Sequence, residues 1–301
     1  MTSWNDVLTE IKEAGSTHDV IRRKYLKKLH EVTQRNIIVY YSGWLQKPGI
    51  NRVSIEDEDK NGFMASIKGL DRSIGLDLIL HTPGGSISAT ESIVEYLHDM
   101  FDEDIRVIVP QLAMSAGTMI ACASKCIIMG KQSSLGPIDP QYKGLPAHGI
   151  IEEFNRAYIE CKKDQDKIPV WQPIIARYHP TLIGECEKSI TWSNSLVRTW
   201  LKQYMFNQDG NADAKVKKII NYLASHSKTK AHDRHFSAAT CLELGLNIEM
   251  MECDQRLQDA ILAVHHSYIH TLSSTDAFKI IENHNGVAFV QSAKIVAIKP
   301  S

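Results

Sequence analysis

The stretch that decides the fold begins at Leu76 and reads LDLILHTPGGSIS (76–88), IRVIVPQLAMSAGTMIACA (105–123) and KCIIMGKQSSLGP (125–137). It contains two apolar strands that each end in a sharp turn and lead into a helix, and a third strand follows. The spacing of the apolar residues predicts, in chain order, strand Leu76–His81, helix Ser86–Phe101, strand Ile105–Pro110, a helix opening at Ser115, and strand Cys126–Met129. Strands joined through helices pair in parallel by right-handed crossovers. In such sheets ligands bind where strands end and helices begin, so both turns are expected to face one crevice.

The second of these turns carries a candidate nucleophile, Ser115, in the run AMSAG (113–117). Small neighbours let a substrate carbonyl approach the hydroxyl, and the amino end of a helix favours negative charge. The amides of Gly85 and Ala116 are expected to converge on one oxygen as an oxyanion hole. In the alternative interpretation, Ser115 is only a helix N-cap and Gly84-Gly85 only a turn. The occurrence of both features at successive strand ends favours acyl transfer by the serine.

Three segments of the chain, HTPGGSIS, PQLAMSAGTMIACA and SSLGPIDPQ, resemble the serine dehydrogenase proteinase family. That family belongs with signal peptide peptidase A and the Clp protease in the Clp/crotonase fold. The similarity continues through HDRHFSAATCLELGLNI and HHSYIHT, so it covers most of the chain. The resemblance implies an α/β fold: a spiral of repeated parallel βαβ units with additional N- and C-terminal helices. It also implies Ser115 as nucleophile, Gly85 and Ala116 as oxyanion donors, a polypeptide substrate, no cofactor, and assembly into a homo-oligomer.

The predicted domain organisation is simple. Residues 1–34 are expected to form an N-terminal helical arm, and residues 35–301 a single Clp/crotonase-like serine peptidase domain. Within that domain NIIVYYS (36–42) predicts the first strand, because it is rich in branched and aromatic residues. Near the end of the chain, Asn285-Gly286 predicts a hairpin turn between two short strands.

Composition excludes several classes of protein. The 34 Lys and Arg residues balance 35 Asp and Glu residues, so the chain has no dedicated nucleic-acid surface. It lacks both an apolar run long enough to span a membrane and a signal peptide, which indicates a cytoplasmic protein. The six cysteines show no paired metal-ligand spacing, and free thiols are expected in a reducing compartment.

The general base is the least determined part of the predicted site. In the Clp protease the base histidine lies in the segment equivalent to SSLGPIDP, where this chain has Asp139 and, several residues later, His148. A Clp-type triad is therefore disfavoured. In signal peptide peptidase A a lysine farther downstream serves as base, and a lysine needs partial burial to lose its proton. Lys167 precedes the apolar stretch IPVWQPII and is the preferred candidate, with Lys163 and His148 as alternatives.

One cluster of possible metal ligands, His226, His232, Asp233 and His235, lies in the second half of the chain. Zinc sites use histidine and carboxylate ligands, but no HExxH motif accompanies the cluster. A structural loop or a loop at the edge of the substrate site is therefore favoured, and no metal is predicted.

Together these features predict a serine endopeptidase that acts through a Ser115 acyl-enzyme, with Lys167 as the base. Two alternatives stay open. A crotonase-like enzyme would use the same oxyanion hole on acyl-CoA, with a carboxylate or histidine for proton transfer. A catalytically silent scaffold, or an enzyme silent until a partner orders Lys162–Pro169, would have the same fold.

Overall fold

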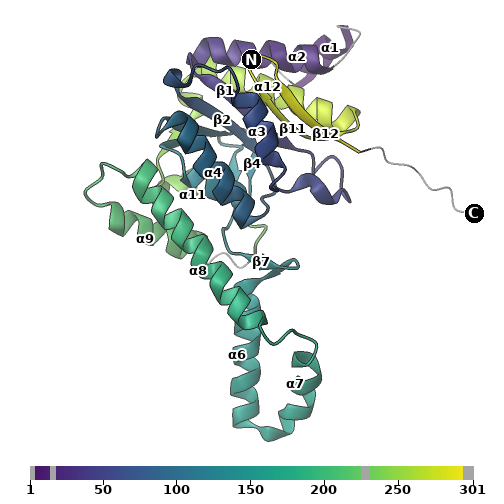
Figure 1. Cartoon of the computed structure of the whole chain (residues 1–301), viewed down its shortest axis with the longest axis vertical. Coiled ribbons are helices and arrows are strands. Elements are labelled where there is room, and N and C mark those ends of the chain that lie inside the picture. Colours follow the sequence, from purple (N-terminus) through teal and green to yellow (C-terminus); the bar gives the residue numbers. More distant parts are fainter. Residues whose placement is uncertain (1–3, 14–17, 225–230, 294–301) are drawn as a thin grey trace, which may run out of the picture.

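The computed structural model of the chain describes residues 4–13, 18–224 and 231–293. It is a mixed α/β structure around a seven-stranded sheet with the order β10-β5-β3-β2-β1-β11-β12 (Figure 1). The five parallel strands are β1 (Asn36–Ser42), β2 (Leu76–His81), β3 (Ile105–Val109), β5 (Cys126–Met129) and β10 (Ile248–Met250). The hairpin β11 (Ala277–Asn283) and β12 (Ala288–Ser292) adds two antiparallel strands beside β1. The predicted mostly parallel sheet is confirmed.

The strands are buried on both faces because residues alternate between two apolar layers. On β2, Leu78 and Leu80 face one cluster while Ile79 faces the other. The layer on the side of Leu78 is closed by α3 (Asp59–Ile67), α4 (Ile87–Phe101), α5 (Ala116–Cys122), α8 (Leu182–Trp200), α9 (Ala212–Leu223) and α11 (Ala238–Leu244). The opposite layer is closed by α1 (Trp4–Glu13), α2 (His18–Thr33) and α12 (Gln255–Ser274). The N-terminal helices thus pack against α12, and α2 also contacts β1 of the sheet.

Two small sheets lie beyond the carboxyl ends of the central strands. The first joins β4 (Leu112–Ala113), β6 (Ser134–Leu135) and β9 (Phe236–Ser237). The second is the hairpin of β7 (Gln141–Tyr142) and β8 (Leu145–Pro146). The short helical turns are η1 (Asn51–Val53), η2 (Arg72–Ile74), η3 (Gln165–Lys167) and η5 (Met251–Cys253), and the π-helix η4 (Leu201–Met205) continues α8.

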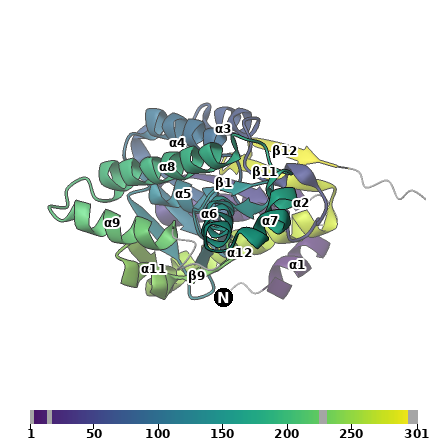
Figure 2. The same cartoon turned by 90° about the horizontal axis from the view of Figure 1, so that it is seen from below.

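A helical projection extends from the β7–β8 hairpin, away from the rest of the molecule (Figure 1). It consists of α6 (Ala147–Lys163), η3 and α7 (Ile168–Ile175), and we call it the α6–α7 projection. Figure 2 looks along α6 from its far end. A small apolar cluster, which includes Ile150 of α6 and Leu182 of α8, packs the projection against α8.

Among the described helices, none combines the length and the apolar character needed to cross a membrane.

Candidate active site

Ser115 lies in the tight turn between β4 and α5. Its backbone has φ 52° and ψ −115°, a region that residues with a side chain rarely adopt. The serine occupies the N-cap position of α5, but its hydroxyl makes no capping hydrogen bond. The alternative interpretation of Ser115 as a simple helix cap therefore does not describe this residue. A strained turn that exposes a hydroxyl is instead typical of nucleophilic serines.

Two glycines let the preceding turn come close to this serine. Gly84 has φ +101°, and a Cβ placed on it would lie 2.5 Å from the Cβ of Ser115. A Cβ on Gly85 would lie 2.3 Å from the backbone nitrogen and oxygen of Ile55. No side chain fits at either position, so glycine is required at both.

The hydrogen bonds around Gly85 determine where its amide points. The Ile55 N–H donates to the Gly84 carbonyl at 2.8 Å, and the Ser86 N–H donates to the Ile55 carbonyl at 2.9 Å. In a parallel bridge of this kind, the middle residue turns its own N–H to the opposite side. The Gly85 N–H therefore points away from Ile55. Ala116 is the first residue of α5, so its N–H has no acceptor within the helix.

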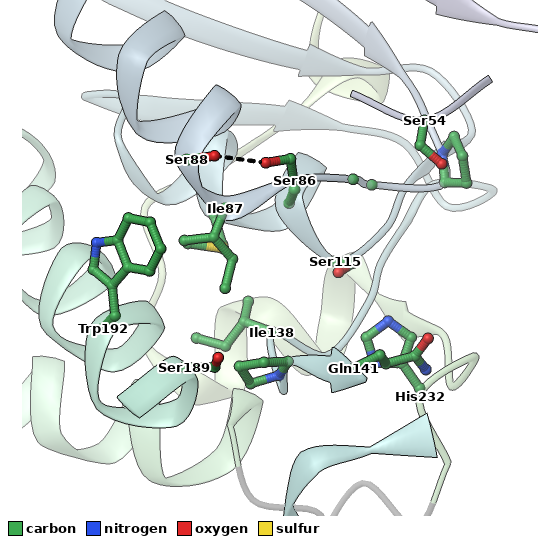
Figure 3. A pocket seen from close by; sticks show the side chains of 16 residues that line it. Ser54, Ser86, Ile87, Ser88, Ser115, Ile138, Gln141, Ser189, Trp192 and His232 are labelled. Atoms are coloured by element: carbon green, nitrogen blue, oxygen red, sulfur yellow. Dashed lines mark hydrogen bonds between the residues drawn. The ribbon is translucent and has the colours of Figure 1, made fainter. Parts of the chain in front are cut away.

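These groups border a cavity of about 420 Å³. Figure 3 shows the hydroxyl of Ser115 facing the cavity, with the ring of His232 on one side and the indole of Trp192 on the other. The apolar part of the lining comes from Ile87, Met119, Ile138 and Trp192, and the polar part includes Ser54, Ser86, Gln141 and Ser189.

His232 and Asp139 form a hydrogen-bonded pair at this cavity. The Nδ1 atom of His232 lies 3.0 Å from Oδ1 of Asp139. Asp139 is fully buried, whereas the His232 side chain is 20% exposed and lines the cavity together with Ser115. The sheet pairing explains the contact, because β6 precedes Asp139 and pairs with β9, which follows His232. Two backbone hydrogen bonds fix Ile138, the residue before Asp139. The Ile138 N–H donates to the Leu223 carbonyl, and the Ser193 hydroxyl donates to the Ile138 carbonyl.

Lys167 lies elsewhere, in the α6–α7 projection. Its side chain is 45% exposed, and its Nζ pairs with Oε2 of Glu160 at 3.2 Å. The expected burial by IPVWQPII does not occur, because this stretch forms the surface helix α7, in which Val170 is 61% exposed. Lys163 and His148 belong to α6 and do not line the cavity either. Among the residues that the structure describes, Ser115, Gly85 and Ala116 border one cavity, and no lysine lines it with them.

The sequence favours a structural loop or a loop at the edge of the substrate site for the histidine cluster, but it does not single out His232 or its contact with Asp139. His226 lies outside the described residues, and among those that are described no group of three or more His, Cys, Asp or Glu side chains could hold a metal ion. His232, one member of that cluster, borders the same cavity as Ser115. The contact of His232 with Asp139 cannot be predicted from their spacing in the sequence, because the two residues meet through the pairing of β6 with β9.

Comparison with known proteins gives the family of the chain. A model of the family described as ClpP-like SDH-type serine proteinase matches residues 16–259. Two uncharacterized proteins of Methanocaldococcus jannaschii are similar to the chain. MJ0137 is 30% identical over 197 residues, which are 65% of this chain and 60% of the relative. MJ1495 is 31% identical over 196 residues, which are 65% of this chain and 59% of the relative. The chain thus spans about 60% of the length of these curated relatives.

Proposed function

The chain belongs to the ClpP-like SDH-type serine proteinase family, and from this premise we propose that it hydrolyses peptide bonds through an acyl-enzyme on Ser115. One observation carries the proposal. A serine in a strained strand-to-helix turn faces a cavity that it shares with a histidine bonded to a buried aspartate.

In the proposed mechanism His232 is the general base. Its Nδ1–H donates to Asp139, which leaves the lone pair of the neutral ring on Nε2. Nε2 takes the proton of Ser115 as the hydroxyl attacks the substrate carbonyl, and then gives that proton to the leaving amine. Asp139 holds the ring in this tautomer and stabilises the imidazolium that forms. Water repeats the sequence to release the acyl group.

The proposed oxyanion hole consists of the N–H groups of Gly85 and Ala116. Both amides lie beside Ser115, and neither is needed for the hydrogen bonds that hold its own turn. Loss of one such donor typically lowers kcat by ~10²–10³. The chemistry needs no cofactor, because every proton transfer is assigned to a side chain of the chain itself.

Lys167 is the competing base. For it to act on Ser115, the α6–α7 projection would have to move, or a second copy of the chain would have to supply the lysine. The His232–Asp139 pair favours the histidine, because it already borders the cavity. The two proposals differ in which single substitution abolishes acylation.

The test is labelling with a fluorophosphonate probe, followed by intact mass and peptide mapping. We expect one adduct on Ser115 in the wild type, none after Ser115→Ala or His232→Ala, and full labelling after Lys167→Ala. His235→Ala is the matched control, since it removes another histidine of the same loop that does not line the cavity. Labelling that survives His232→Ala and fails after Lys167→Ala would transfer the role of base to the lysine. If the wild type is never labelled, the proposed peptidase activity is contradicted, and a catalytically silent scaffold or a partner-gated protein is favoured.

Three further features belong to the proposal. We infer a Clp/crotonase-type spiral for residues 35–301, which the parallel βαβ order supports. We infer a homo-oligomer, which the exposed apolar side chains of the α6–α7 projection, such as Ile159 and Val170, support. We infer a cytoplasmic site of action, because all six cysteines are free thiols.

A further inference from the structure

Strand β11 carries a buried charged side chain on each of its two faces. On one face Lys279 pairs with Asp59, and on the other Glu282 pairs with Arg22. All four side chains are at most 2% exposed. Each carboxylate also accepts a hydrogen bond from a buried tyrosine. Tyr40 donates to Asp59 at 2.8 Å, and Tyr268 donates to Glu282 at 2.6 Å. Buried ion pairs contribute little net stability, because the cost of desolvation offsets most of the attraction. We therefore ask which parts of the backbone each pair keeps in position.

The pair of Lys279 and Asp59 holds both ends of one tripeptide. The Nζ atom of Lys279 donates to the carbonyl of Ser54 at 2.7 Å and to both oxygens of Asp59, at 2.8 and 3.0 Å. Oδ2 of Asp59 accepts the N–H of Glu56 at 3.0 Å. The residue between these two anchored peptide groups is Ile55, whose N–H and carbonyl pair with Gly84 and Ser86.

The anchored tripeptide in turn determines the direction of the Gly85 amide. Gly84 and Ser86 are the two neighbours of Gly85, and both are bonded to Ile55. Gly85 itself approaches the Ile55 backbone too closely to admit a Cβ. A shift of Ile55 would therefore be passed to the peptide plane that carries the proposed oxyanion donor. On the other face of β11, the hydrogen bonds of Arg22 and Glu282 go to residues of α2 and α12, and the Tyr268 ring stacks on Tyr41 of β1. Among the described residues, none of these hydrogen-bond partners lines the cavity.

We propose that Lys279, Asp59 and Tyr40 are positioning residues that hold the Gly85 N–H at the oxyanion position through Ile55. This inference rests on the proposed peptidase function. It assigns a buried lysine on the last hairpin of the sheet to the support of the catalytic turn. None of the three residues lines the cavity, so we expect them to affect the transition state more than substrate binding.

The experiment compares two matched double variants. Lys279→Met/Asp59→Asn removes the charges on one face of β11, and Arg22→Met/Glu282→Gln removes them on the other. Both leave no buried charge without its partner, so both are expected to fold, as checked by circular dichroism and thermal unfolding. The milder pair Tyr40→Phe and Tyr268→Phe removes one hydrogen bond from each network. Peptide hydrolysis, the rate of fluorophosphonate labelling and the affinity for a peptide boronic acid are measured for each variant well below its Tm.

We expect Lys279→Met/Asp59→Asn to lower kcat and the labelling rate by about 10- to 100-fold, less than complete loss of a donor. KM is expected to stay within about twofold, and the boronic acid to bind about as many times more weakly as kcat falls. Tyr40→Phe is expected to give a smaller loss in the same direction. The Arg22 and Tyr268 variants are expected to match the wild type in all three measurements.

Two results would overturn the inference. One is wild-type kcat in folded Lys279→Met/Asp59→Asn, and the other is an equal loss in the Arg22→Met/Glu282→Gln control. Either can be told apart from failure of the proposed function, because in that case the wild type itself would neither hydrolyse peptides nor be labelled.

Discussion

At the scale of single residues, the catalytic turn depends on the absence of a side chain at position 84. An alanine there would need a positive φ, and its Cβ would meet Ser115 and the Met114 carbonyl. We expect Gly84→Ala to lower the free energy of unfolding by about 1–3 kcal/mol and to abolish labelling of Ser115.

The matched control for this prediction is Gly245→Ala. Gly245 also has a positive φ of +99°, but no atom lies within 4 Å of its added Cβ. It should lose similar stability while Ser115 keeps its reactivity, as measured by urea unfolding and probe labelling. Normal labelling of Gly84→Ala would show that the turn can tolerate the clash.

The residues of the site could be predicted from the sequence only where the chemistry is local. Ser115 and Gly85 lie in short motifs at strand ends, and such motifs can be recognised from a few consecutive residues. The contact of His232 with Asp139 depends on a pairing between β6 and β9 that no local pattern contains. The sequence favours Lys167 because an apolar stretch follows it. An apolar sequence alone, however, does not show whether the helix that it forms is buried or exposed.

At the scale of elements, the strands β1, β2 and β5 begin and end where the sequence predicts. Their apolar runs are buried on both faces, and turn residues mark their ends, so the pattern has a single interpretation. The pair Asn285-Gly286 predicts the C-terminal hairpin, and in the structure Gly286 has the positive φ of 83° that such turns need. The α6–α7 projection was not predicted, because its helices have amphipathic patterns like those of helices that cover a sheet.

The α6–α7 projection is expected to open independently of the sheet. Its contact with the body involves a small apolar cluster, and many of its side chains are exposed. Elements with few buried apolar contacts open at a lower free energy than the core. In native-state hydrogen exchange, the amides of α6 and α7 should therefore exchange well before those of β1 and β2. Equal protection in both regions would mean that the projection is covered, as in an oligomer, and repeating the measurement across protein concentrations separates these cases.

At the scale of the whole molecule, buried histidines make stability depend on pH. Burial, assisted by the neighbouring His266, lowers the pKa of His265 from 6.5 to about 3. Burial, with a contribution from His265, also lowers the pKa of His81 well below 6.5. Neither ring nitrogen of His81 has a hydrogen-bond partner among the described residues. The His265 side chain is therefore neutral in the folded state at pH 5, and burial favours the neutral form of His81 as well.

The sign follows from which state binds the proton. Below pH 6.5 the unfolded chain protonates these histidines while the folded chain does not, so stability is complete above pH 6.5 and falls as the pH drops toward 3. His265 should remove about 2 kcal/mol of unfolding free energy between pH 7 and pH 5, and His81 should act in the same direction. Urea unfolding at the two pH values measures this loss. His81→Phe should make the loss of unfolding free energy between the two pH values smaller, and an unchanged loss in that variant would exclude His81 as a source.

The strained backbone at Ser115 has a consequence for inheritance. Glycine adopts φ 52° and ψ −115° without penalty, so Ser115→Gly should raise the stability of the fold by about 1–2 kcal/mol while removing the nucleophile. Selection for abundance alone would therefore favour inactive descendants of this chain at this position. If descendants of this chain keep serine at position 115, its chemistry has been under continuous selection. A glycine there would identify a descendant in which that chemistry is no longer selected.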